Sequence, residues 1–418
     1  MQLKKFDIPG PGGHSLSALL DLPLDGKPIA YALFAHCFTC SKNLKAVFHI
    51  CRALTRERIA VLRFDFTGLG ESGGDFADTS LVSNVEDLVA AARFMQERFE
   101  GPRLLIGHSM GGAAVVMAAP AIASCAAVVT IAAPADPRHV SRALGPAAEA
   151  IAANGEAQVN ISGRSFVLRK KFLDDLRTID PEAVIRDLNR ALLVMHSPTD
   201  EIVGIENAAK IFQAARHPKS FIALDRADHL LSKTADSRYA GAVIAAWAKR
   251  YVAAPAAEKT APPPQDNRIT ARTGPGGFLT EIQVNRHSLV ADEPAAVGGT
   301  DQGPTPFDLL VAALGACSSM TLRMYADRKG WPLEAATVRL RHAKIHAAEC
   351  ESCEIAEGML DRIEREIEIE GPLDPGQRQR LLQIADRCPV HKTLTSQVEI
   401  KTRLREPQGE KHAERIHR

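Results

Sequence analysis

Short apolar runs alternate with helical patterns along the first half of the chain. Each run is apolar at nearly every position, and the runs occur at residues 30–35, 59–64, 103–106, 126–131, 191–196 and 220–224. Helical patterns such as residues 84–99 lie between them. Strands that are apolar on both faces, with helices between them, are typical of an open and mostly parallel sheet. We therefore predict an α/β fold with helices on both faces of the sheet.

A long insertion interrupts this alternation. About 60 residues separate the runs at 126–131 and 191–196, which is far more than one crossover helix needs. We interpret the segment at about 135–190 as a lid or cap on the α/β domain. Its composition does not identify a substrate.

The second half of the chain follows a different pattern. Its segments with strand-like alternation are 276–285, 337–347, 363–371 and 394–404. A long, largely apolar helix is predicted at 304–330, with Gly330 as the residue that ends it, and a second helix at 374–388. This pattern indicates an α+β domain, in which antiparallel strands pack on one or two helices.

An Ala/Pro-rich segment separates the two halves. Residues 252–268 lack apolar periodicity and contain three consecutive prolines, which favour an extended spacer. We predict an α/β domain at 1–252, a linker at 253–266, an α+β domain at 267–405 and a polar tail at 406–418.

Composition argues against several classes of partner. The chain has 418 residues, with 51 Lys and Arg against 50 Asp and Glu, so it lacks the charge excess expected for binding nucleic acid or a membrane surface. We see neither a secretory signal nor an apolar stretch of the length that spans a bilayer. Eight cysteines in such a chain indicate reduced thiols with catalytic, redox or metal roles. We therefore expect a cytoplasmic protein.

A nucleophile motif follows the run at 103–106. Gly107, Ser109 and Gly111 form a G-x-S-x-G pattern, and helical sequence follows. At a strand-to-helix turn this pattern is a nucleophile elbow, and the helix N-terminus favours an oxyanion beside the serine. The pattern also occurs by chance, but the strand before it and the helix after it favour a catalytic serine.

A base and an acid follow in the chain order of serine hydrolases. Asp200 and His229 follow the last two predicted strands of the first half, so both emerge at carboxyl ends of strands, where parallel sheets build their sites. We predict that Asp200 orients the imidazole and that His229 takes the proton of Ser109. Asp228 and Asp136 remain rival acids.

A loop with the pattern D-x-x-G-x-G-x-S occupies residues 65–72. Together with the elbow, it resembles the α/β-hydrolase superfamily over residues 1–252. The resemblance implies an oxyanion loop at His36-Cys37-Phe38-Thr39, with the backbone N–H groups of Phe38 and Met110 as donors. Cys37 stands where this family usually has glycine, and its Cβ restricts the backbone there.

The same loop contains a C-x-x-C spacing, from Cys37 to Cys40. In a cytosolic chain this spacing after a strand also suits a redox dithiol. Because no thioredoxin-like surroundings accompany it, we favour the oxyanion loop and assign redox chemistry to other cysteines.

Cys317 and Cys388 lie in the two predicted helices of the second half. Cys317 sits within ALGACSSM of the apolar helix, and Cys388 ends the later helix within ADRCPVHK. Buried free cysteines usually act as small hydrophobic residues, so composition alone favours a structural role. However, the two motifs in this order, together with Pro306-Phe307-Asp308, resemble the OsmC/organic hydroperoxide resistance family over residues 267–404.

This resemblance implies a thiol peroxidase that forms a homodimer. Cys317 is then the peroxidatic thiolate, and Cys388 resolves its sulfenic acid into a disulfide that an external dithiol reduces. The family uses an arginine and an acidic residue to activate the thiolate. Asp308 is the nearest acidic match, and Arg286 or Arg272 is the candidate arginine, although either also suits the protein surface.

A weaker signal lies at His342, His346, Cys350 and Cys353. Their residue types suit zinc, but the histidines fall on one face of a predicted strand and the cysteines in the following turn. A dithiol, or no chemistry at all, remains an alternative, and we predict no metal site.

We therefore predict a bifunctional enzyme. A serine hydrolase for a carboxylic ester or related acyl substrate is joined to a cysteine-based reductase of organic hydroperoxides, with no bound cofactor. The alternative is that only the hydrolase is active, and that the second domain serves for dimerisation or ligand binding.

Overall fold

The computed structural model describes residues 2–24, 26–138, 140, 144–161, 164–252, 268–285, 287–346 and 358–404. The chain divides into two compact units, one formed by Met1–Arg272 with Glu281–Leu289 and the other by Thr273–Thr280 with Val290–Arg418. The predicted linker at 253–266 and the predicted tail at 406–418 lie outside the described residues. The predicted domain boundaries therefore stay predictions.

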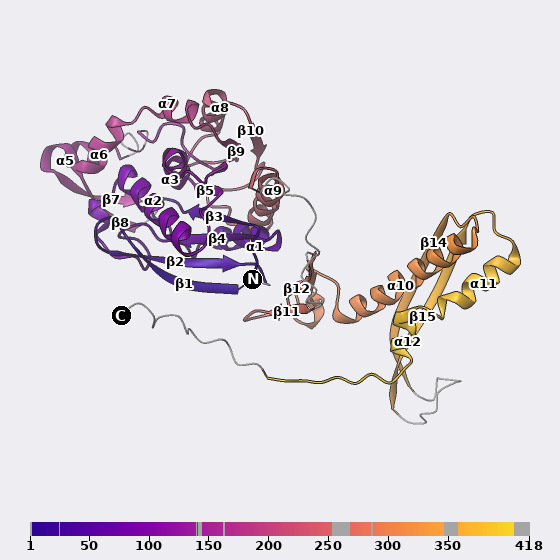
Figure 1. Cartoon of the computed structure of the whole chain (residues 1–418). Coiled ribbons are helices and arrows are strands. Elements are labelled where there is room, and N and C mark those ends of the chain that lie inside the picture. Colours follow the sequence, from indigo (N-terminus) through magenta and orange to yellow (C-terminus); the bar gives the residue numbers. More distant parts are fainter. Residues whose placement is uncertain are drawn as a thin grey trace, which may run out of the picture. The chain divides into compact units, whose positions relative to one another are not determined.

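An eight-stranded sheet forms the centre of the first unit (Figure 1). Its strands in spatial order are β1 (Gln2–Pro9), β2 (Ser15–Leu22), β4 (Ile59–Phe64), β3 (Ala30–Ala35), β5 (Leu104–His108), β6 (Ala127–Ile131), β9 (Ala191–His196) and β10 (Lys219–Ala223). β2 pairs antiparallel with both β1 and β4, and the other neighbours pair parallel. The predicted α/β fold is confirmed. The structure adds β1 and β2, which were not predicted.

Successive residues of the central strands point to opposite faces of this sheet. In β3, Leu33 joins a core that includes residues of α2 and α3, whereas Phe34 joins a core that includes residues of α1 and α9. The main helices of the unit are α1 (Lys45–Arg56), α2 (Leu81–Arg98), α3 (Met110–Ala118), α8 (Glu206–Ala214) and α9 (Thr234–Val252). Because both faces are covered, the central strands are apolar at nearly every position.

The residues predicted as a lid form a small subdomain between β6 and β9. Its elements are α5 (Pro146–Asn154), β7 (Glu156–Ile161), β8 (Arg164–Arg169), α6 (Lys170–Thr178) and α7 (Pro181–Arg186). β7 and β8 form an antiparallel hairpin that is separate from the large sheet. Phe172 and Leu176 of α6 are buried in the core beside α2 and α3, so this subdomain packs firmly on the unit.

Long antiparallel strands and the helices on them form much of the second half. The elements are α10 (Pro306–Lys329), β14 (Ala335–His346), β15 (Met359–Glu370), α11 (Pro375–Ala385) and α12 (Pro389–Leu394). A sheet of β11 (Ile269–Thr273), β12 (Thr280–Val284) and β13 (His287–Ala291) precedes α10. α10 ends at Gly330 in a left-handed conformation, as predicted. The predicted α+β class is confirmed.

One predicted strand is wrong. The alternation at 394–404 predicts a strand, but α12 ends at Leu394, and residues 397–404 pair with no strand in the described part of the chain. A strand needs a neighbour to satisfy its backbone hydrogen bonds, and here none is supplied. Ile400 is 84% exposed and Leu404 is 98% exposed, so the apolar positions of this segment face solvent.

By length and composition alone, α10 is long and apolar enough to cross a bilayer, and it is the one such helix among the described residues. The residue pattern of the chain had predicted no such stretch. A single helix of this kind is weak evidence for a membrane span, because core helices of other proteins meet the same criterion.

Candidate functional site

The nucleophile elbow lies between β5 and α3. Ser109 has φ +55° and ψ −123°, a backbone conformation that costs free energy in a residue with a Cβ. The turn is also tight: a Cβ added to Gly107 would lie 2.2 Å from the carbonyl oxygen of Gly111. A Cβ on Gly111 would lie 2.5 Å from the carbonyl oxygen of Ala35 at the end of β3. Glycine is therefore required at both positions.

Ser109, His229 and Asp200 form a continuous chain of hydrogen bonds. His229 Nε2 lies 3.0 Å from Ser109 Oγ, and His229 Nδ1 lies 2.8 Å from Asp200 Oδ2. The other carboxylate oxygen of Asp200 accepts hydrogen bonds from the N–H groups of Ile202 and Val203, both at 2.9 Å. Burial opposes ionisation of Asp200, but the His229 ring and these N–H groups outweigh it and hold the pKa of Asp200 below its usual range.

The structure brings Asp200, rather than its two rivals, to His229. Asp228 accepts a hydrogen bond from the Ser232 N–H at 2.8 Å. Asp136 forms an ion pair with Arg138 at 2.7 Å. Asp200 follows β9 and His229 follows β10, so both residues lie beside the elbow at the carboxyl edge of the sheet. Their roles as acid and base stay predictions.

The predicted oxyanion donors belong to the start of α3 and to the loop after β3. Met110 is the first residue of α3, where an N–H group has no partner within the helix. The ring of Phe38 packs against the rings of Phe76 and Phe172, with centroid distances of 5.2 and 5.3 Å. Because Phe172 belongs to α6, the lid subdomain contacts the predicted oxyanion loop directly.

Cys37 and Cys40 are joined by a disulfide, which corrects the expectation that the thiols of this chain are reduced. The Cys40 N–H donates to the carbonyl oxygen of Cys37 at 3.1 Å, and this turn brings the two Cα atoms to 5.3 Å, within the range of disulfides. The disulfide closes a small ring that contains Phe38 and so restricts the predicted oxyanion loop. The free cysteines of the described residues are Cys51, Cys125, Cys317 and Cys388.

Buried ions fasten the far end of this loop. Lys42 Nζ is withdrawn from solvent and donates to Asp65 Oδ2 at 2.5 Å and to Glu71 Oε2 at 3.1 Å. Asp65 also accepts the backbone N–H of Lys42 at 2.6 Å. Arg63 donates to the Lys42 carbonyl oxygen at 2.6 Å and pairs with Asp21 at 2.7 Å. These charges tie the loop after β3 to the D-x-x-G-x-G-x-S segment.

His108 is a functional candidate that the sequence analysis did not identify, although it is the second residue of the elbow motif. It is buried, and its Nε2 donates to the carbonyl oxygen of His229 at 2.7 Å. Its Nδ1 has no hydrogen-bond partner in the structure as described. Burial, and then the neighbouring His229, lower the pKa of His108 to about 4. A neutral His108 therefore holds the backbone of the predicted base.

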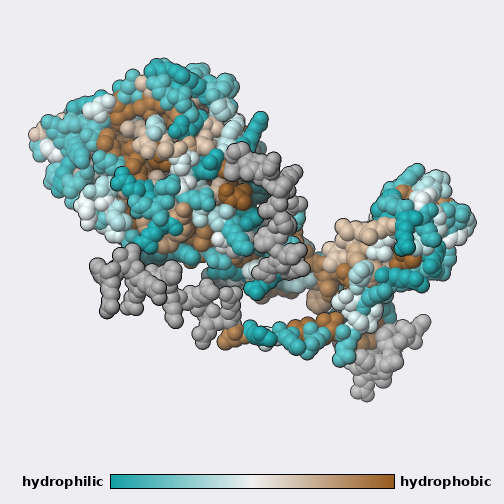
Figure 2. Space-filling view, viewed as in Figure 1, coloured by the Kyte–Doolittle hydropathy of each residue, from teal (hydrophilic) through white to brown (hydrophobic). Residues whose placement is uncertain are grey.

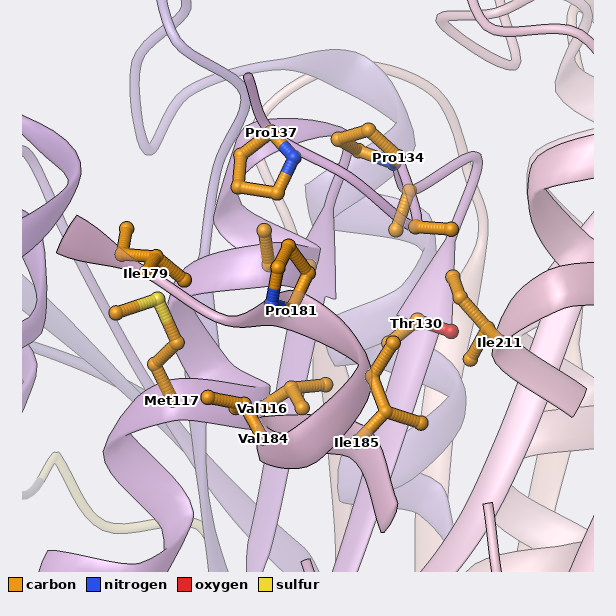
Figure 3. A pocket seen from close by; sticks show the side chains of 14 residues that line it. Val116, Met117, Thr130, Pro134, Pro137, Ile179, Pro181, Val184, Ile185 and Ile211 are labelled. Atoms are coloured by element: carbon orange, nitrogen blue, oxygen red, sulfur yellow. The ribbon is translucent and has the colours of Figure 1, made fainter. Parts of the chain in front are cut away.

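An apolar pocket lies beside the helix that follows the elbow (Figure 3). α3, the segment after β6, α7 and α8 line it, for instance through Val116, Ile185 and Ile211. Its volume of about 20 Å³ has room for roughly one water molecule. On the face shown in Figure 2, apolar side chains gather over the region of α3 and α7. A larger apolar group enters this pocket only if a lining element such as α7 moves.

In the second unit, Cys317 and Cys388 lie together. Cys317 is half-buried in the middle of α10, and Cys388 is fully buried before α12. Cys388 Sγ accepts the N–H of His391 at 3.3 Å, lies 3.7 Å from Ser318 Oγ, and lies within hydrogen-bonding reach of Cys317. Burial raises the pKa of Cys388, but these hydrogen bonds outweigh it and hold the pKa below its ordinary value.

Of the residues predicted to activate the thiolate, Asp308 lies at the start of α10. Asp308 is exposed and caps α10, where its carboxylate accepts the N–H and the hydroxyl of Thr305 at 2.9 and 2.7 Å. Roughly 13 Å of helix rise separate it from the predicted peroxidatic cysteine. Arg272 is exposed in β11, and Arg286 lies outside the described residues. The arginine that the structure brings to the cysteine pair is Arg365, which the sequence analysis did not consider.

The described residues contain no group of three or more side chains that could hold a metal ion. Cys350 and Cys353 lie outside them. His342 Nε2 lies 2.9 Å from Asp361 Oδ1, and its ring stacks on Phe307 at a centroid distance of 4.5 Å. His342 thus has a carboxylate and an aromatic ring as neighbours, and the absence of a metal site stays a prediction.

Two protein families match separate parts of the chain. Residues 30–165 match the family described as serine aminopeptidase, S33, and this range includes the elbow. Residues 299–403 match the family described as OsmC-like protein, and this range includes Cys317 and Cys388.

Several solved structures and curated proteins are similar to the first unit. The esterase domain from a Rhodothermus marinus protein is 53% identical and covers 60% of this chain and 99% of its own, with a TM-score of 0.51. Est1E from Butyrivibrio proteoclasticus, with ferulic acid bound, is 20% identical over 59% of this chain and 98% of its own, with a TM-score of 0.53, which shows the fold alone. The uncharacterised protein YfhR from Salmonella typhimurium is 23% identical over 203 residues, which are 48% of this chain and 65% of that relative.

The sheet topology and these likenesses define an α/β hydrolase. The chain belongs to the α/β-hydrolase superfamily through its first unit, and it carries an OsmC-like domain in its second half. Both resemblances read from the sequence are therefore confirmed.

The buried ions under the loop after β3 predict a large cost for removing one of them. Lys42→Met leaves Asp65 buried without its cation, and breaking a buried pair from one side costs about 3–5 kcal/mol. We expect the free energy of unfolding of the first unit to fall by about that amount. Equilibrium urea denaturation, followed by Trp247 fluorescence in a Trp331→Phe background, measures it. Lys5→Met, which removes an exposed partner of Glu71, serves as the control and should change stability far less.

The buried neutral His108 predicts a loss of stability in acid. Its pKa is about 4 in the folded chain and about 6.5 when unfolded, so the unfolded state binds the extra proton as pH falls through this window. The loss amounts to roughly 3 kcal/mol between pH 7 and pH 4. We expect His108→Gln, which keeps an N–H donor, to flatten this slope in unfolding experiments at several pH values. Parallel slopes for both proteins would contradict the assignment.

Proposed function

We propose that the chain is a bifunctional enzyme, a serine esterase joined to a thiol peroxidase that reduces organic hydroperoxides. The hydrogen-bonded chain of Ser109, His229 and Asp200 carries the proposal for the first unit. The adjacency of Cys317 and Cys388 within an OsmC-like domain supports the second activity.

In the proposed esterase reaction, Ser109 Oγ attacks the carbonyl carbon of the ester while His229 Nε2 takes its proton. Asp200 accepts the hydrogen bond from His229 Nδ1 and stabilises the imidazolium that forms. The N–H groups of Phe38 and Met110 donate to the developing oxyanion. The imidazolium then protonates the leaving alcohol, and a water molecule, deprotonated by His229, hydrolyses the acyl-enzyme.

The surroundings of the elbow support an apolar acyl group. The pocket beside α3 is apolar apart from the hydroxyl of Thr130. Separately, the ring of Phe38 packs against Phe172 of the lid subdomain, which adds an apolar contact at the predicted oxyanion loop. Because the pocket is small, the substrate class we propose is a carboxylic ester with a short acyl chain, longer chains requiring movement of the lid.

In the proposed peroxidase reaction, the Cys317 thiolate attacks the terminal oxygen of R–O–O–H. The O–O bond breaks, the alkoxide R–O⁻ leaves as the alcohol after taking a proton from water, and Cys317 becomes a sulfenic acid. The Cys388 thiolate attacks that sulfur, the S–S bond forms, and hydroxide leaves as water after taking a proton. An external dithiol then reduces the disulfide and becomes a disulfide itself, so no bound cofactor is needed.

We also propose that the OsmC-like domain forms a homodimer. α10 exposes Met320 and Met324 by 64% and 72%, and Ile400 lies in an alternating segment that has no partner strand in the described chain. Exposed apolar faces and unpaired strand-like segments are typical of association surfaces. The balanced charge supports a cytoplasmic location without nucleic acid or membrane partners.

The same exposed surface supports the alternative, in which only the hydrolase is active and the second domain provides dimerisation or ligand binding. Hydrogen-bond donors around Cys388 favour the peroxidase instead, because a cysteine that only fills space needs no donors to its sulfur. Peroxide-dependent formation of a disulfide between Cys317 and Cys388 separates the two possibilities.

For the esterase, we expect Ser109→Ala to abolish labelling by a fluorophosphonate and hydrolysis of p-nitrophenyl acetate. Asp200→Asn should lower kcat by about 10⁴-fold, because the imidazole loses the acceptor that sets its tautomer. Asp228→Asn is the matched control, since this neighbouring carboxylate accepts the N–H of Ser232 and the amide can still accept it, and it should retain activity. Loss of activity in Asp228→Asn with activity retained in Asp200→Asn would reverse the assignment of the acid.

For the peroxidase, we expect Cys317→Ser to abolish consumption of an alkyl hydroperoxide in the presence of a dithiol. Cys388→Ser should still form one sulfenic acid per chain but no internal disulfide, as read by mass spectrometry. Cys125→Ala is the control, because burial raises the pKa of Cys125 to about 11 and leaves its thiol unreactive. Peroxide turnover that persists in Cys317→Ser would refute the proposed activity.

A further inference from the structure

Arg365 occupies an unexpected position in β15. The partly buried positions around it in this strand are Ile363, Ile367 and Ile369, and the positions between them are exposed glutamates. Its side chain is only 13% exposed. A guanidinium on the packed face of a strand is costly unless each of its donors finds a partner, so its partners indicate why it is there.

The guanidinium of Arg365 bridges three parts of the OsmC-like domain. Nη1 donates to Ser318 Oγ of α10 at 3.0 Å and to the carbonyl oxygen of Ala385 at the end of α11 at 3.2 Å. Nη2 donates to Asp386 Oδ1 at 2.5 Å. Asp386 is exposed and lies two residues before Cys388. Arg365 thus joins the helix of one cysteine to the turn that carries the other.

Ser318 lies between this arginine and the sulfur of Cys388. Both Ser318 and Cys388 are fully buried, and Ser318 Oγ lies 3.7 Å from Cys388 Sγ. Because the hydroxyl oxygen accepts the hydrogen bond from Arg365, its own hydrogen is left to point at the sulfur. A hydroxyl that is polarised by a guanidinium is a stronger donor than an isolated one, and it favours the anionic form of the sulfur.

We propose that Arg365 is a positioning residue for the cysteine pair, which fixes the Ser318 hydroxyl as a donor to Cys388. This inference rests on the proposed peroxidase function, which it deepens. The arrangement favours the Cys388 thiolate twice in the cycle. The Cys388 thiolate first attacks the Cys317 sulfenic acid, and hydroxide leaves as water after taking a proton. The Cys388 thiolate is later the leaving group, when an external dithiol attacks the Cys317 sulfur of the disulfide.

The test separates the two chemical steps at Cys317 and Cys388. Reduced full-length protein receives one equivalent of an alkyl hydroperoxide, and dimedone traps the sulfenic acid at intervals. For Arg365→Gln we expect the sulfenic acid to form within about twofold of the wild-type rate. We expect the disulfide to form about tenfold more slowly at pH 7, because a rise of one unit in the pKa of the attacking thiol lowers its thiolate fraction about tenfold. Arg339→Gln, which removes an exposed arginine paired with Glu368 on the same strands, should match the wild type.

The pH dependence distinguishes positioning from mere structural support. The groups that face Cys388 are Cys317, Ser318, Arg365 with its partner Asp386, and the His391 N–H. Because a higher pH ionises a thiol without help from a donor, the slow step of Arg365→Gln should approach the wild-type rate as pH rises. A deficit that persists at every pH would overturn the proposal, because a distorted site is not rescued by ionising the thiol.

Two further variants test the role of Arg365 if Arg365→Gln does not fold or if the chain has no peroxidase activity. If Arg365→Gln does not fold, Ser318→Ala removes only the hydroxyl and should slow disulfide formation to a similar degree. If the wild-type chain consumes no peroxide, the proposed function fails. The effect of Arg365 on Cys388 can still be measured as the rate at which iodoacetamide alkylates Cys388 in Cys317→Ser. Adding Arg365→Gln to that variant should reduce alkylation about tenfold at pH 7. Equal alkylation with and without Arg365 would overturn the inference.

Discussion

The first unit depends on a close approach between two backbone segments, the start of α3 and the end of β3. Gly111 comes so near to the carbonyl oxygens of Ala35 and His36 that no side chain fits at its position. The contact lies in the first turn of α3, just after Ser109 with its positive φ of 55°. The predicted oxyanion loop starts at the same point of contact, so the predicted nucleophile and its expected donors are positioned by the same backbone contact.

The surrounding structure holds both sides of that contact in place. On the loop side, the Cys37–Cys40 disulfide and the buried pair of Lys42 and Asp65 fasten the two ends of the loop. On the helix side, His108 binds the carbonyl oxygen of His229 and so joins the elbow to the segment that carries the predicted base. Buried polar groups thus cluster around the elbow and the predicted base, although their desolvation lowers the stability of the fold.

Much of the first unit could be predicted, because its central strands are buried on both faces and separated by helices. The carboxyl edge of a parallel sheet then places Ser109, Asp200 and His229 together without further information. β1 escaped prediction because most of its residues are exposed, which leaves no continuous apolar run. The disulfide escaped because a C-x-x-C spacing suits a reduced dithiol and an oxidised pair equally well, and the turn geometry that decides between them is not visible in residue types.

The OsmC-like domain was predicted less completely for a related reason. Residues 394–404 alternate as a strand would, so the sequence pattern predicts one. A strand forms only beside a neighbouring strand, and the described chain offers none for this segment. Arg365 was overlooked because an arginine among glutamates looks like a charge on the surface. Its alternation with Glu364 and Glu366 was the available signal, since it shares the face of the strand that carries isoleucines.

The two sulfurs of the disulfide in the loop after β3 are not equivalent. Cys37 is only 5% exposed, whereas Cys40 is partly exposed, so an external thiolate reaches Cys40 first. Attack there expels the Cys37 thiolate into a site from which water is excluded, and desolvation makes it a poor leaving group. The pair therefore resists the class of dithiol that the proposed peroxidase cycle consumes.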